Sequence, residues 1–376
     1  MDVLCEANWL PTVDDGYRRM HAAIESARRS VRLEMYIFQA GELGDRFRDA
    51  LVGAAHRGVR VRVLVDGFGS KGVSPDYWAA LRAAGGEAAW FNPLTLRRAA
   101  IRDHRKLLVI DDEQAFLGGF NIAPEYAGDG VARGWRDLGL AIAGEPVGCL
   151  AASFDVMWAH RHFRHPRGSR MWLSRLKRSL RACGSAEVMP TGPGLGRNAF
   201  SASLRRTLRG AHDVRIETAY FIPGFFLRRA LVRIARRGGR VRLLLAGRSD
   251  VGIAQTAGRS FYASLLRAGV EIAEYQPQIL HAKLALVDDA VFAGSSNLDT
   301  RSLGINYEIM VRLVDPDLAT GGRALFDADW ERSTPIRRDE WLRSRTWADR
   351  FAGVVAKFLL TKVDLWLARR QLRALS

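Results

Sequence analysis

Apolar residues along the chain follow two spacings, one typical of β-strands and one typical of α-helices. In 57–67 (RGVRVRVLVDG) and 237–247 (RGGRVRLLLAG), apolar and polar side chains alternate after a glycine, as in a half-buried strand. The same reasoning predicts further strands over 31–38, 87–91, 214–220 and 271–275, and helices over 16–29, 43–57, 75–84, 146–158, 198–209, 225–237 and 259–267. This alternation of strands and helices predicts an α/β layered fold.

The order of predicted elements in the first half of the chain returns in the second half. In each half a helix, a strand and a second helix precede the glycine-led strand, and a third helix and a short strand follow it. An internal duplication with two pseudo-twofold-related lobes accounts for this order. We predict a first lobe over 1–159, a basic interdomain linker over 160–195, a second lobe over 196–335 and a basic amphipathic tail over 336–376.

A repeated polar motif follows the short strand in each half. The first copy reads IRDHRKLLVIDDEQAFLGGFN (101–121), and the second reads ILHAKLALVDDAVFAGSSN (279–297). Both contain His-x-Lys-x-x-x-x-Asp and end in Asn after a turn of small residues. The candidate catalytic residues are therefore His104, Lys106, Asp111, His281, Lys283 and Asp288, with Asn121 and Asn297 as candidate phosphate-binding residues.

The spacing within the motif indicates phosphoryl chemistry. Residues two apart in an extended segment point to the same face, so each His projects together with its Lys. An imidazole acts as nucleophile, base or acid near neutral pH, and a lysine ammonium places a positive charge beside a phosphate oxygen. The Asn after each small-residue turn adds an amide donor next to exposed backbone N–H groups. Two such half-sites facing each other predict a phosphodiester held between two histidines.

Two alternative roles of the motif histidines are less well supported. A histidine beside a buried strand is often a satisfied core residue, but this role would have to arise twice in matched surroundings. A metal site is also disfavoured, because the sequence has no His-Glu-x-x-His, no paired cysteines and no carboxylate cluster at ligand spacing. We therefore expect neither a metal nor another cofactor.

The duplicated motif resembles that of the phospholipase D superfamily, and the surrounding sequence is similar to bacterial cardiolipin synthases. Within that family the chain resembles the short B-type form, which lacks N-terminal membrane spans. The similar stretches are LEMYIFQAGELGDRF, RGVRVRVLVDGFGS, DHRKLLVIDDEQAFLGGFNIAPEY, TAYFIPG and LHAKLALVDDAVFAGSSNLDTRSLGINYEI, within 15–330. The resemblance implies two phospholipase D-like lobes, each a mixed β-sheet flanked by helices.

The resemblance also implies an activity, in which two phosphatidylglycerol molecules give cardiolipin and glycerol. One histidine, which we take to be His104, would attack phosphorus and form a covalent phosphohistidine. His281 would protonate the departing alcohol and then deprotonate the acceptor hydroxyl. Three alternatives stay open: phospholipid hydrolysis, phosphodiester cleavage in nucleic acid, and a non-enzymatic membrane-binding protein.

Three pairs of acidic residues lie near the motifs or in matching strands, and they have different expected roles. Asp137 and Glu308 occupy equivalent positions, and in the superfamily such carboxylates resemble partners that hold the far nitrogen of each histidine. The sequence does not tell whether each serves its own lobe. Asp111 and Asp288 lie at strand ends, so we expect them to be structural. Glu34 and Glu217 either line the cleft or form buried structural pairs.

The charge of the chain predicts a polyanionic partner. Over 376 residues the formal net charge is +17, and the isoelectric point is near 10.6. Nucleic acid and an anionic membrane surface both fit such a charge. Within the basic stretch 160–179, which carries His160, His162 and His165, Trp172 is the only Trp or Tyr available to stack on bases. With the resemblance, this favours an anionic phospholipid surface and phosphatidylglycerol as partners and disfavours nucleic acid; the oligomeric state stays open.

Cysteine usage and the absence of long apolar runs bear on the compartment. Cys5, Cys149 and Cys183 are widely separated and odd in number, which predicts no disulfide framework and a reducing cytoplasm. The N-terminus lacks the features of a signal peptide, and no apolar run approaches the roughly 20 residues of a membrane span. We therefore expect a peripheral protein on the cytoplasmic face of the inner membrane.

The tail 347–373 is predicted to be a helix with one apolar arc, interrupted by Lys362 and Arg369. It can lie in a membrane interface or pack on the globular body, and the sequence does not decide between the two. The arc consists of Phe351, Val355, Phe358, Leu359, Val363 and Trp366.

Overall fold

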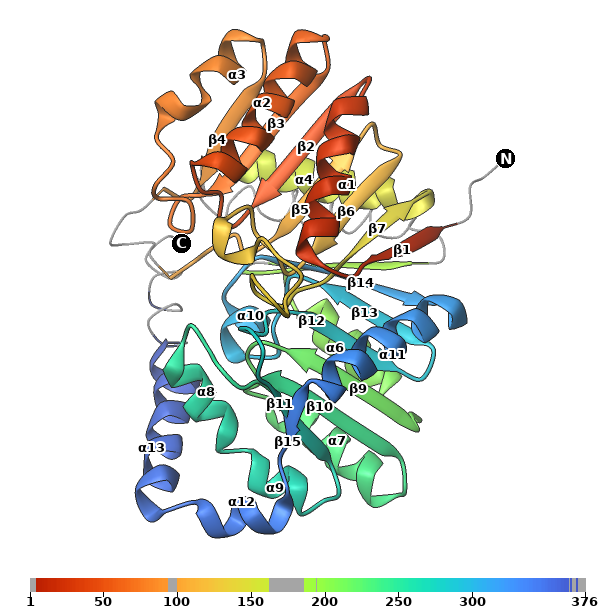
Figure 1. Ribbon diagram of the computed structural model, residues 1–376, viewed down its shortest axis with the longest axis vertical. Helices are drawn as coiled ribbons and strands as arrows, with labels where there is room; N and C mark the ends of the chain where they lie inside the picture. The colour runs from red at the N-terminus through yellow and green to blue at the C-terminus, as the bar shows by residue number, and fades with distance from the viewer. Residues whose placement is uncertain are drawn as a thin grey trace.

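The computed structural model describes residues 5–93, 100–161, 186–193, 195–364, 366 and 370, and it consists of two stacked lobes, each built around one β-sheet (Figure 1). The basic stretch with His162, His165 and Trp172 lies outside the described residues, as does Cys183.

The first lobe carries a seven-stranded mixed sheet. Its elements are β1 (Glu6–Leu10), α1 (Val13–Ser26), β2 (Ser30–Met35), α2 (Glu42–His56), β3 (Arg60–Asp66), the 3₁₀ turn η1 (Pro75–Trp78), α3 (Ala79–Ala83), β4 (Glu87–Phe91), β5 (Lys106–Ile110), β6 (Gln114–Gly118), the 3₁₀ turn η2 (Pro124–Tyr126), β7 (Gly139–Ala143) and α4 (Glu145–His160).

The second lobe carries an eight-stranded mixed sheet. Its elements are β8 (Glu187–Thr191), α6 (Ala199–Thr207), β9 (Asp213–Thr218), α7 (Phe225–Arg236), β10 (Arg240–Ala246), α8 (Gly252–Arg259), α9 (Tyr262–Leu266), β11 (Glu271–Tyr275), β12 (Lys283–Val287), β13 (Ala290–Gly294), α10 (Thr300–Gly304), β14 (Glu308–Val314), α11 (Pro316–Glu331), β15 (Ser333–Pro335), α12 (Arg338–Ser344), α13 (Trp347–Phe358) and the π-helical turn η5 (Leu359–Val363).

The two sheets have the same strand order and register, which confirms the predicted α/β fold with duplicated lobes. The order is β1-β7-β6-β5-β2-β3-β4 in the first sheet and β8-β14-β13-β12-β9-β10-β11 in the second, where β15 extends the far edge. Met35 lies opposite Lys106 in the first sheet, and Thr218 lies opposite Lys283 in the second. The motif residues therefore occupy equivalent places in both lobes.

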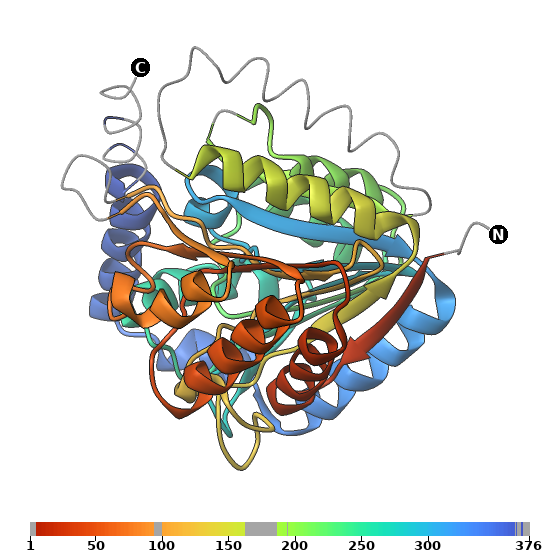
Figure 2. The same cartoon turned by 90° about the horizontal axis from the view of Figure 1, so that it is seen from above.

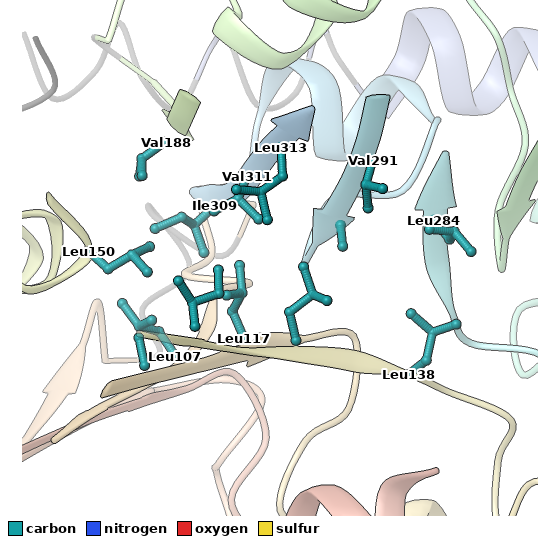
Figure 3. Close-up of a cluster of buried hydrophobic side chains, with 14 of the residues drawn as sticks. Leu107, Leu117, Leu138, Leu150, Val188, Leu284, Val291, Ile309, Val311 and Leu313 are labelled. Atoms are coloured by element: carbon teal, nitrogen blue, oxygen red, sulfur yellow. The ribbon is translucent and has the colours of Figure 1, made fainter. Parts of the chain in front are cut away.

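The sheets pack face to face and share a central core. The outer face of the first sheet is covered by α1, α2 and α3, and that of the second sheet by α6, α7, α8 and α9. The helix α4 lies on the opposite side of the first sheet from α1 and α2 (Figure 2). Between the sheets, Leu107 and Leu117 of one lobe share a buried cluster with Leu284 and Ile309 of the other (Figure 3). The lobes are thus joined by a continuous hydrophobic core.

Two predicted helices differ from those in the structure. The predicted helix 75–84 is instead a 3₁₀ turn capped by Ser74 and a short helix, α3, which ends before Gly85 at a φ of 89°. The predicted helix 259–267 is divided between α8 and α9. The break follows Ser260, whose hydroxyl donates to the carbonyl of Ala257 and so competes with the helical ladder.

The cysteine prediction is wrong in one respect, because Cys149 on α4 is disulfide-bonded. Spacing along the chain does not reveal which cysteines folding brings together, so the sequence could not predict this bond. Among the described residues, no helix has both the length and the apolar character needed to cross a bilayer.

The motif aspartates hold turns at the far ends of their strands. The Asp111 carboxylate accepts hydrogen bonds from the backbone N–H groups of Arg28, Arg29 and Ser30, at 2.9, 2.7 and 2.7 Å. Partial burial raises the pKa of Asp111, but these hydrogen bonds outweigh it and hold the pKa below its usual value. Asp288 likewise accepts from the N–H groups of His212 and Asp213. Both aspartates therefore join β5 or β12 to the start of the neighbouring strand.

We expect Asp111→Ala to lower the free energy of unfolding by roughly 2–4 kcal/mol, because three backbone donors lose a charged acceptor. Asp111→Asn should lose less, because Asn keeps one acceptor oxygen and tolerates the positive φ of 55° at this position. Urea unfolding measures both. Glu113→Ala is the matched control, since Glu113 is exposed, and it should change stability by less than about 1 kcal/mol. Equal stability of Asp111→Ala and wild type would contradict this role.

Candidate active site

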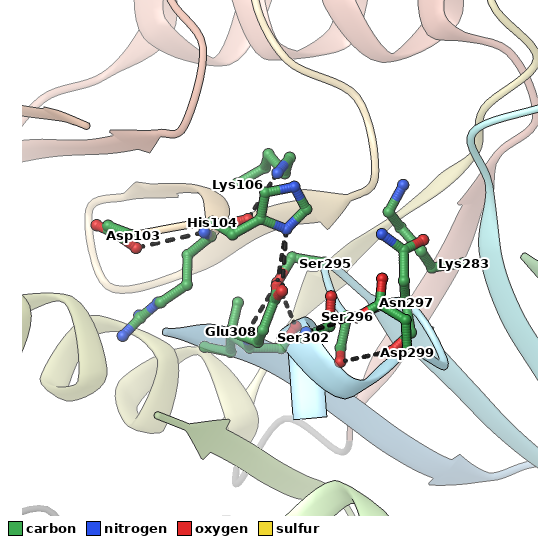
Figure 4. Close-up of polar contacts among 12 residues, drawn as sticks. Asp103, His104, Lys106, Lys283, Ser295, Ser296, Asn297, Asp299, Ser302 and Glu308 are labelled. Carbon is green, nitrogen blue, oxygen red and sulfur yellow. Dashed lines mark hydrogen bonds and ion pairs between the residues drawn. The ribbon is translucent and has the colours of Figure 1, made fainter. Parts of the chain in front are cut away.

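The two motifs meet where the lobes join. Lys106 and Lys283 are the first residues of β5 and β12, and His104 and His281 lie two residues before them. All four side chains are largely or fully buried, with exposed fractions of 12% for the His104 side chain and 5% for that of His281. Figure 4 shows His104, Lys106 and Lys283 around one space, with Asn297 beside Lys283.

Backbone pairing between the lobes places each histidine next to the other lobe. Asp103 forms a β-bridge with Tyr307, and Leu280 forms the equivalent bridge with Arg136. The N–H of His104 donates to the carbonyl of Tyr307 at 2.9 Å, and the N–H of His281 donates to that of Arg136 at 2.7 Å. The residue after each bridge is Glu308 or Asp137, so each carboxylate is delivered to the histidine of the opposite lobe.

These carboxylates contact the histidines at Nδ1. Glu308 lies 3.0 and 3.1 Å from Nδ1 of His104 through its two oxygens, and Asp137 Oδ2 lies 2.7 Å from Nδ1 of His281. An acceptor at Nδ1 holds the proton there and leaves the lone pair on Nε2. At His281 the Lys283 ammonium also lies 2.8 Å from Nδ1 and 3.2 Å from Nε2. The sequence did not tell which lobe each carboxylate serves, and in the structure both reach across the pseudo-twofold axis.

The residue that contacts the carboxylate from the motif turn differs between the lobes. The hydroxyl of Ser295 donates to Glu308 at 2.5 Å. The equivalent residue in the first lobe is Gly119, where an added Cβ would lie 2.4 Å from Asp137 Oδ1. A side chain is therefore excluded at Gly119, whereas at Ser295 it serves as a hydrogen-bond donor.

The cleft favours neutral forms of its titratable groups. Burial lowers the pKa of both histidines, to about 4 for His281 and well below its usual value for His104, and the positive charges of Lys106 and Lys283 lower both further. Burial also lowers the pKa of Lys106 to about 7 and that of Lys283 to about 8. Each histidine thus responds to the lysine of the other lobe, as expected for one shared site.

Glu308 is shifted in the opposite direction. Burial raises its pKa to about 8, although the charge of Lys106 and the hydrogen bond from Ser295 act against the rise. The carboxylate therefore holds its charge only if nearby cations remain charged. A bound phosphodiester would raise the lysine pKa values and so change this balance.

The two motif asparagines have different surroundings. The Asn121 side chain accepts from the N–H of Ile37 at 2.9 Å and donates to the Tyr126 hydroxyl at 2.8 Å. That hydroxyl lies 3.5 Å from Nε2 of His281. Asn121 therefore orders the site through Tyr126, whereas Asn297 stands beside Lys283 (Figure 4).

Glu34 and Glu217 are fully buried and lie near arginines. Glu34 is 3.0 Å from Arg105, and burial raises its pKa against the charge of that arginine. Burial and the charge of Asp329 raise the pKa of Glu217, while the charge of Arg136 lowers it. The ion pair with Arg105 favours a buried structural role for Glu34, whereas neither carboxyl oxygen of Glu217 has a hydrogen-bond partner among the described residues.

Aromatic residues at the site were missed by sequence reasoning. Tyr36 lies against His104 with ring centroids 4.8 Å apart, and Tyr126 and Trp135 lie against His281 at 5.1 and 5.5 Å. Tyr36 stands two residues after Glu34, in a strand that the duplication already matched to the second lobe. Alternation along the strand would place Tyr36 with Glu34, on the face opposite to Lys106, so the pattern did not indicate its contact with His104. Tyr126 and Trp135 lie in an irregular segment without a repeating signal.

Comparison with known families decides the class of the protein. The family model described as the PLD-like domain of cardiolipin synthase matches residues 20–157 and 204–330, one segment in each lobe. The chain belongs to this family. The resemblance to phospholipase D-like cardiolipin synthases is thereby confirmed.

Relatives within the family are similar along most of the chain. Cardiolipin synthase 1 of Bacillus anthracis is 32% identical over 337 residues, which are 86% of this chain and 66% of the relative. Cardiolipin synthase A of Pseudomonas aeruginosa is 32% identical over 355 residues, 91% of this chain and 71% of the relative. The chain thus spans roughly two thirds of the length of such relatives.

A solved structure supports the fold. The phosphatidylserine synthase of Haemophilus influenzae superposes with a TM-score of 0.71, over 96% of this chain and 94% of that chain, at 13% sequence identity. At this identity the likeness shows the fold alone, and the fold is the two-lobed arrangement described above.

We expect the ligand-free cleft to bind sulfate less tightly as the pH rises from 7 to 9. Lys106 and Lys283 lose their protons in this range, because their pKa values are about 7 and 8, while sulfate keeps its charge. Isothermal titration calorimetry across pH 6–10 measures the dissociation constant. A control with Lys357→Met, a change away from the cleft, should show the same pH dependence as wild type. A dissociation constant that stays constant up to pH 10 would show that the lysines keep ordinary pKa values.

Proposed function

We propose that the protein is a phosphatidyltransferase that converts two phosphatidylglycerol molecules into cardiolipin and glycerol. The observation that carries the proposal is the pair of histidines in one cleft, each held at Nδ1 by a carboxylate of the opposite lobe and each close to a lysine. Membership in the family supports the choice of a phospholipid substrate. The net charge of +17 supports work at an anionic phospholipid surface, and we place the protein peripherally on the cytoplasmic face of the inner membrane.

In the first step, Nε2 of His104 attacks the phosphorus of the phosphatidyl donor. A bond forms between Nε2 and phosphorus, and the bond from phosphorus to the glycerol oxygen breaks. We assign the attack to His104 because its side chain is the more exposed of the two, 12% against 5%. Its low pKa keeps the imidazole neutral, and Glu308 stabilises the positive charge that develops on it.

His281 supplies the proton for the departing glycerol oxygen. Its pKa of about 4 in the ligand-free cleft is low for an acid at neutral pH. That value already includes the raising effect of Asp137, and the negative charge of a bound phosphodiester raises the pKa further, so His281 takes up its proton together with the substrate. Glycerol then leaves with the proton from His281, and phosphorus stays bonded to His104.

The second step reverses the roles of the groups. His281, now neutral, takes the proton from the hydroxyl of a second phosphatidylglycerol. The oxygen of this hydroxyl bonds to phosphorus while the bond to His104 breaks, and cardiolipin forms. Lys106 and Lys283 stabilise the phosphoryl oxygens in both steps, with Asn297 as an amide donor and Asn121 acting through Tyr126.

The product distinguishes this reaction from hydrolysis. After incubation with phosphatidylglycerol vesicles, we expect thin-layer chromatography to show cardiolipin and an equimolar amount of glycerol. Phosphatidic acid as the main product would mean that water replaces the acceptor alcohol. If neither cardiolipin nor phosphatidic acid forms, the protein does not act on this lipid.

His104→Ala and His281→Ala should each lower turnover by at least about 10³-fold, because each removes a group that changes bonding in the reaction. His56→Ala, on the exposed end of α2, is the matched control and should keep wild-type turnover. With a donor labelled at phosphorus, acid-sensitive label should be trapped on the peptide that contains His104. Label on the His281 peptide would reverse the assignment of the two histidines.

Glu308→Gln and Asp137→Asn should each lower kcat by roughly 10²–10⁴-fold with smaller changes in KM. Each amide keeps the shape of the carboxylate but loses the charge that stabilises the imidazolium. ¹⁵N NMR of the imidazoles reports the tautomer, and Glu308→Gln should alter His104 while Asp137→Asn alters His281. Glu113→Gln serves as the control. A change confined to the histidine of the same lobe as the substituted carboxylate would contradict the crossed arrangement.

A further inference from the structure

The segment from Trp347 to Trp366 exposes an unusual amount of apolar surface. Among the described residues, fourteen large apolar side chains are exposed, and half of them lie on this segment. The exposed fractions reach 81% for Trp347, 65% for Phe351 and 57% for Phe358. The full set is Trp347, Phe351, Val354, Val355, Phe358, Leu359 and Trp366, which we call the apolar stripe. Contiguous exposed apolar surface of this kind marks an interaction site in a soluble protein.

The stripe lies on one face of a helix that is fixed to the body by its opposite face. Positions 347, 351, 354, 355 and 358 recur at helical spacing along α13. The inward face carries the buried Gly353 and Ala356 and packs on α8, where a Cβ at Gly353 would lie 3.0 Å from that of Ser260. Small residues thus face the protein while the large apolar ones face outward, the reverse of an ordinary surface helix.

Both ends of the helix are held in place. At its start, Thr346 and Asp349 form a reciprocal capping box. After the π-helical turn, Asp364 pairs with Arg301 of α10 at 2.7 Å. Arg301 also donates to the carbonyl of Ala100, four residues before His104 in the first lobe. The C-terminal end of the stripe is therefore attached next to the catalytic cleft. The helix α13 runs along the edge of the second lobe toward the first (Figure 1).

Cations border the stripe. Arg343, Arg350, Lys362 and Arg370 are exposed along or beside it, and the guanidinium of Arg370 lies 5.5 Å from the centroid of the Trp366 ring. An apolar face flanked by basic side chains, with tryptophan and arginine at one end, matches the boundary between headgroups and acyl chains of an anionic bilayer. The twelve residues of α13 span roughly 18 Å, so the stripe can contact a surface along a line.

We propose that the apolar stripe lies flat in the surface of an anionic phospholipid bilayer and sets the mouth of the catalytic cleft against the lipid headgroups. The occupant is a bilayer, since the stripe carries both the apolar face and the basic border that such a surface requires. The inference rests on the proposed function in taking lipid as the substrate, but bilayer binding is measurable without turnover.

Vesicle sedimentation in the His104→Ala background tests the proposal, with Phe351→Ser/Phe358→Ser as the variant and Val131→Ser/Val314→Ser as the matched control. All four side chains are exposed, so the folds should be retained, and thermal unfolding checks this. On phosphatidylglycerol vesicles the variant should bind at least tenfold more weakly than the control, because two aromatic side chains no longer enter the apolar layer. Phosphatidylcholine vesicles should bind every form more weakly than phosphatidylglycerol vesicles. Binding of the variant within twofold of the control would overturn the proposal.

Two further measurements distinguish a bilayer from a second copy of the chain and separate binding from turnover. If sedimentation velocity shows that Phe351→Ser/Phe358→Ser converts a dimer to a monomer while vesicle binding is unchanged, the stripe joins two copies of the chain and the proposal is wrong. With His104 restored, the variant should lose turnover on vesicles at least tenfold but keep it on short-chain phosphatidylglycerol dissolved below its micellar concentration. If the wild-type protein turns over neither vesicles nor dissolved phosphatidylglycerol, the proposed function is wrong. The vesicle-binding measurement then still tests the role of the apolar stripe.

Discussion

The crossed pairing of buried carboxylates with histidines is the constraint on which the rest of the structure depends. Asp137 and Glu308 have no exposed surface, and a carboxylate in such surroundings is costly unless a charged or hydrogen-bonding partner stands beside it. Each finds its histidine in the other lobe, through a backbone bridge one residue away. A single lobe would keep a histidine and a lysine but lose the acceptor that orients the imidazole. The shared core between the sheets is therefore a condition for the site as well as for stability.

The two lobes share the order of seven strands, but the side chains around the two histidines differ. Strand order and the register at Lys106 and Lys283 agree between the lobes. In contrast, Glu308 receives a hydrogen bond from Ser295, whereas Asp137 fits against Gly119. His281 is also packed against Tyr126 and Trp135, while His104 meets Tyr36. Two histidines in unequal surroundings suit a reaction in which one must bond to phosphorus and the other must carry a proton.

Much of this could be predicted from the sequence, because duplication doubles every local signal. The strand pattern at 57–67 and 237–247 and the repeated motif led to the fold class and to the histidines and lysines that the structure brings to one cleft. The crossing was not predictable, since His104 and Glu308 are 204 residues apart and no local pattern reports such a contact. The same holds for the disulfide at Cys149. The apolar arc of the tail was visible, but its outward direction depends on how Gly353 and Ala356 pack on α8, which is a tertiary property.

Burial is the main cause of the pKa shifts in the cleft, and the negative charge of a phosphodiester substrate would change their balance. Burial favours the neutral forms of Lys106, Lys283, His281 and Glu308. The formal charges of the two lysines and the two carboxylates cancel. A phosphodiester adds one negative charge, and protonation of one histidine restores neutrality. In the proposed reaction the substrate therefore supplies the charge that this protonation balances, and a bound phosphodiester favours formation of the acid needed for departure of the alcohol.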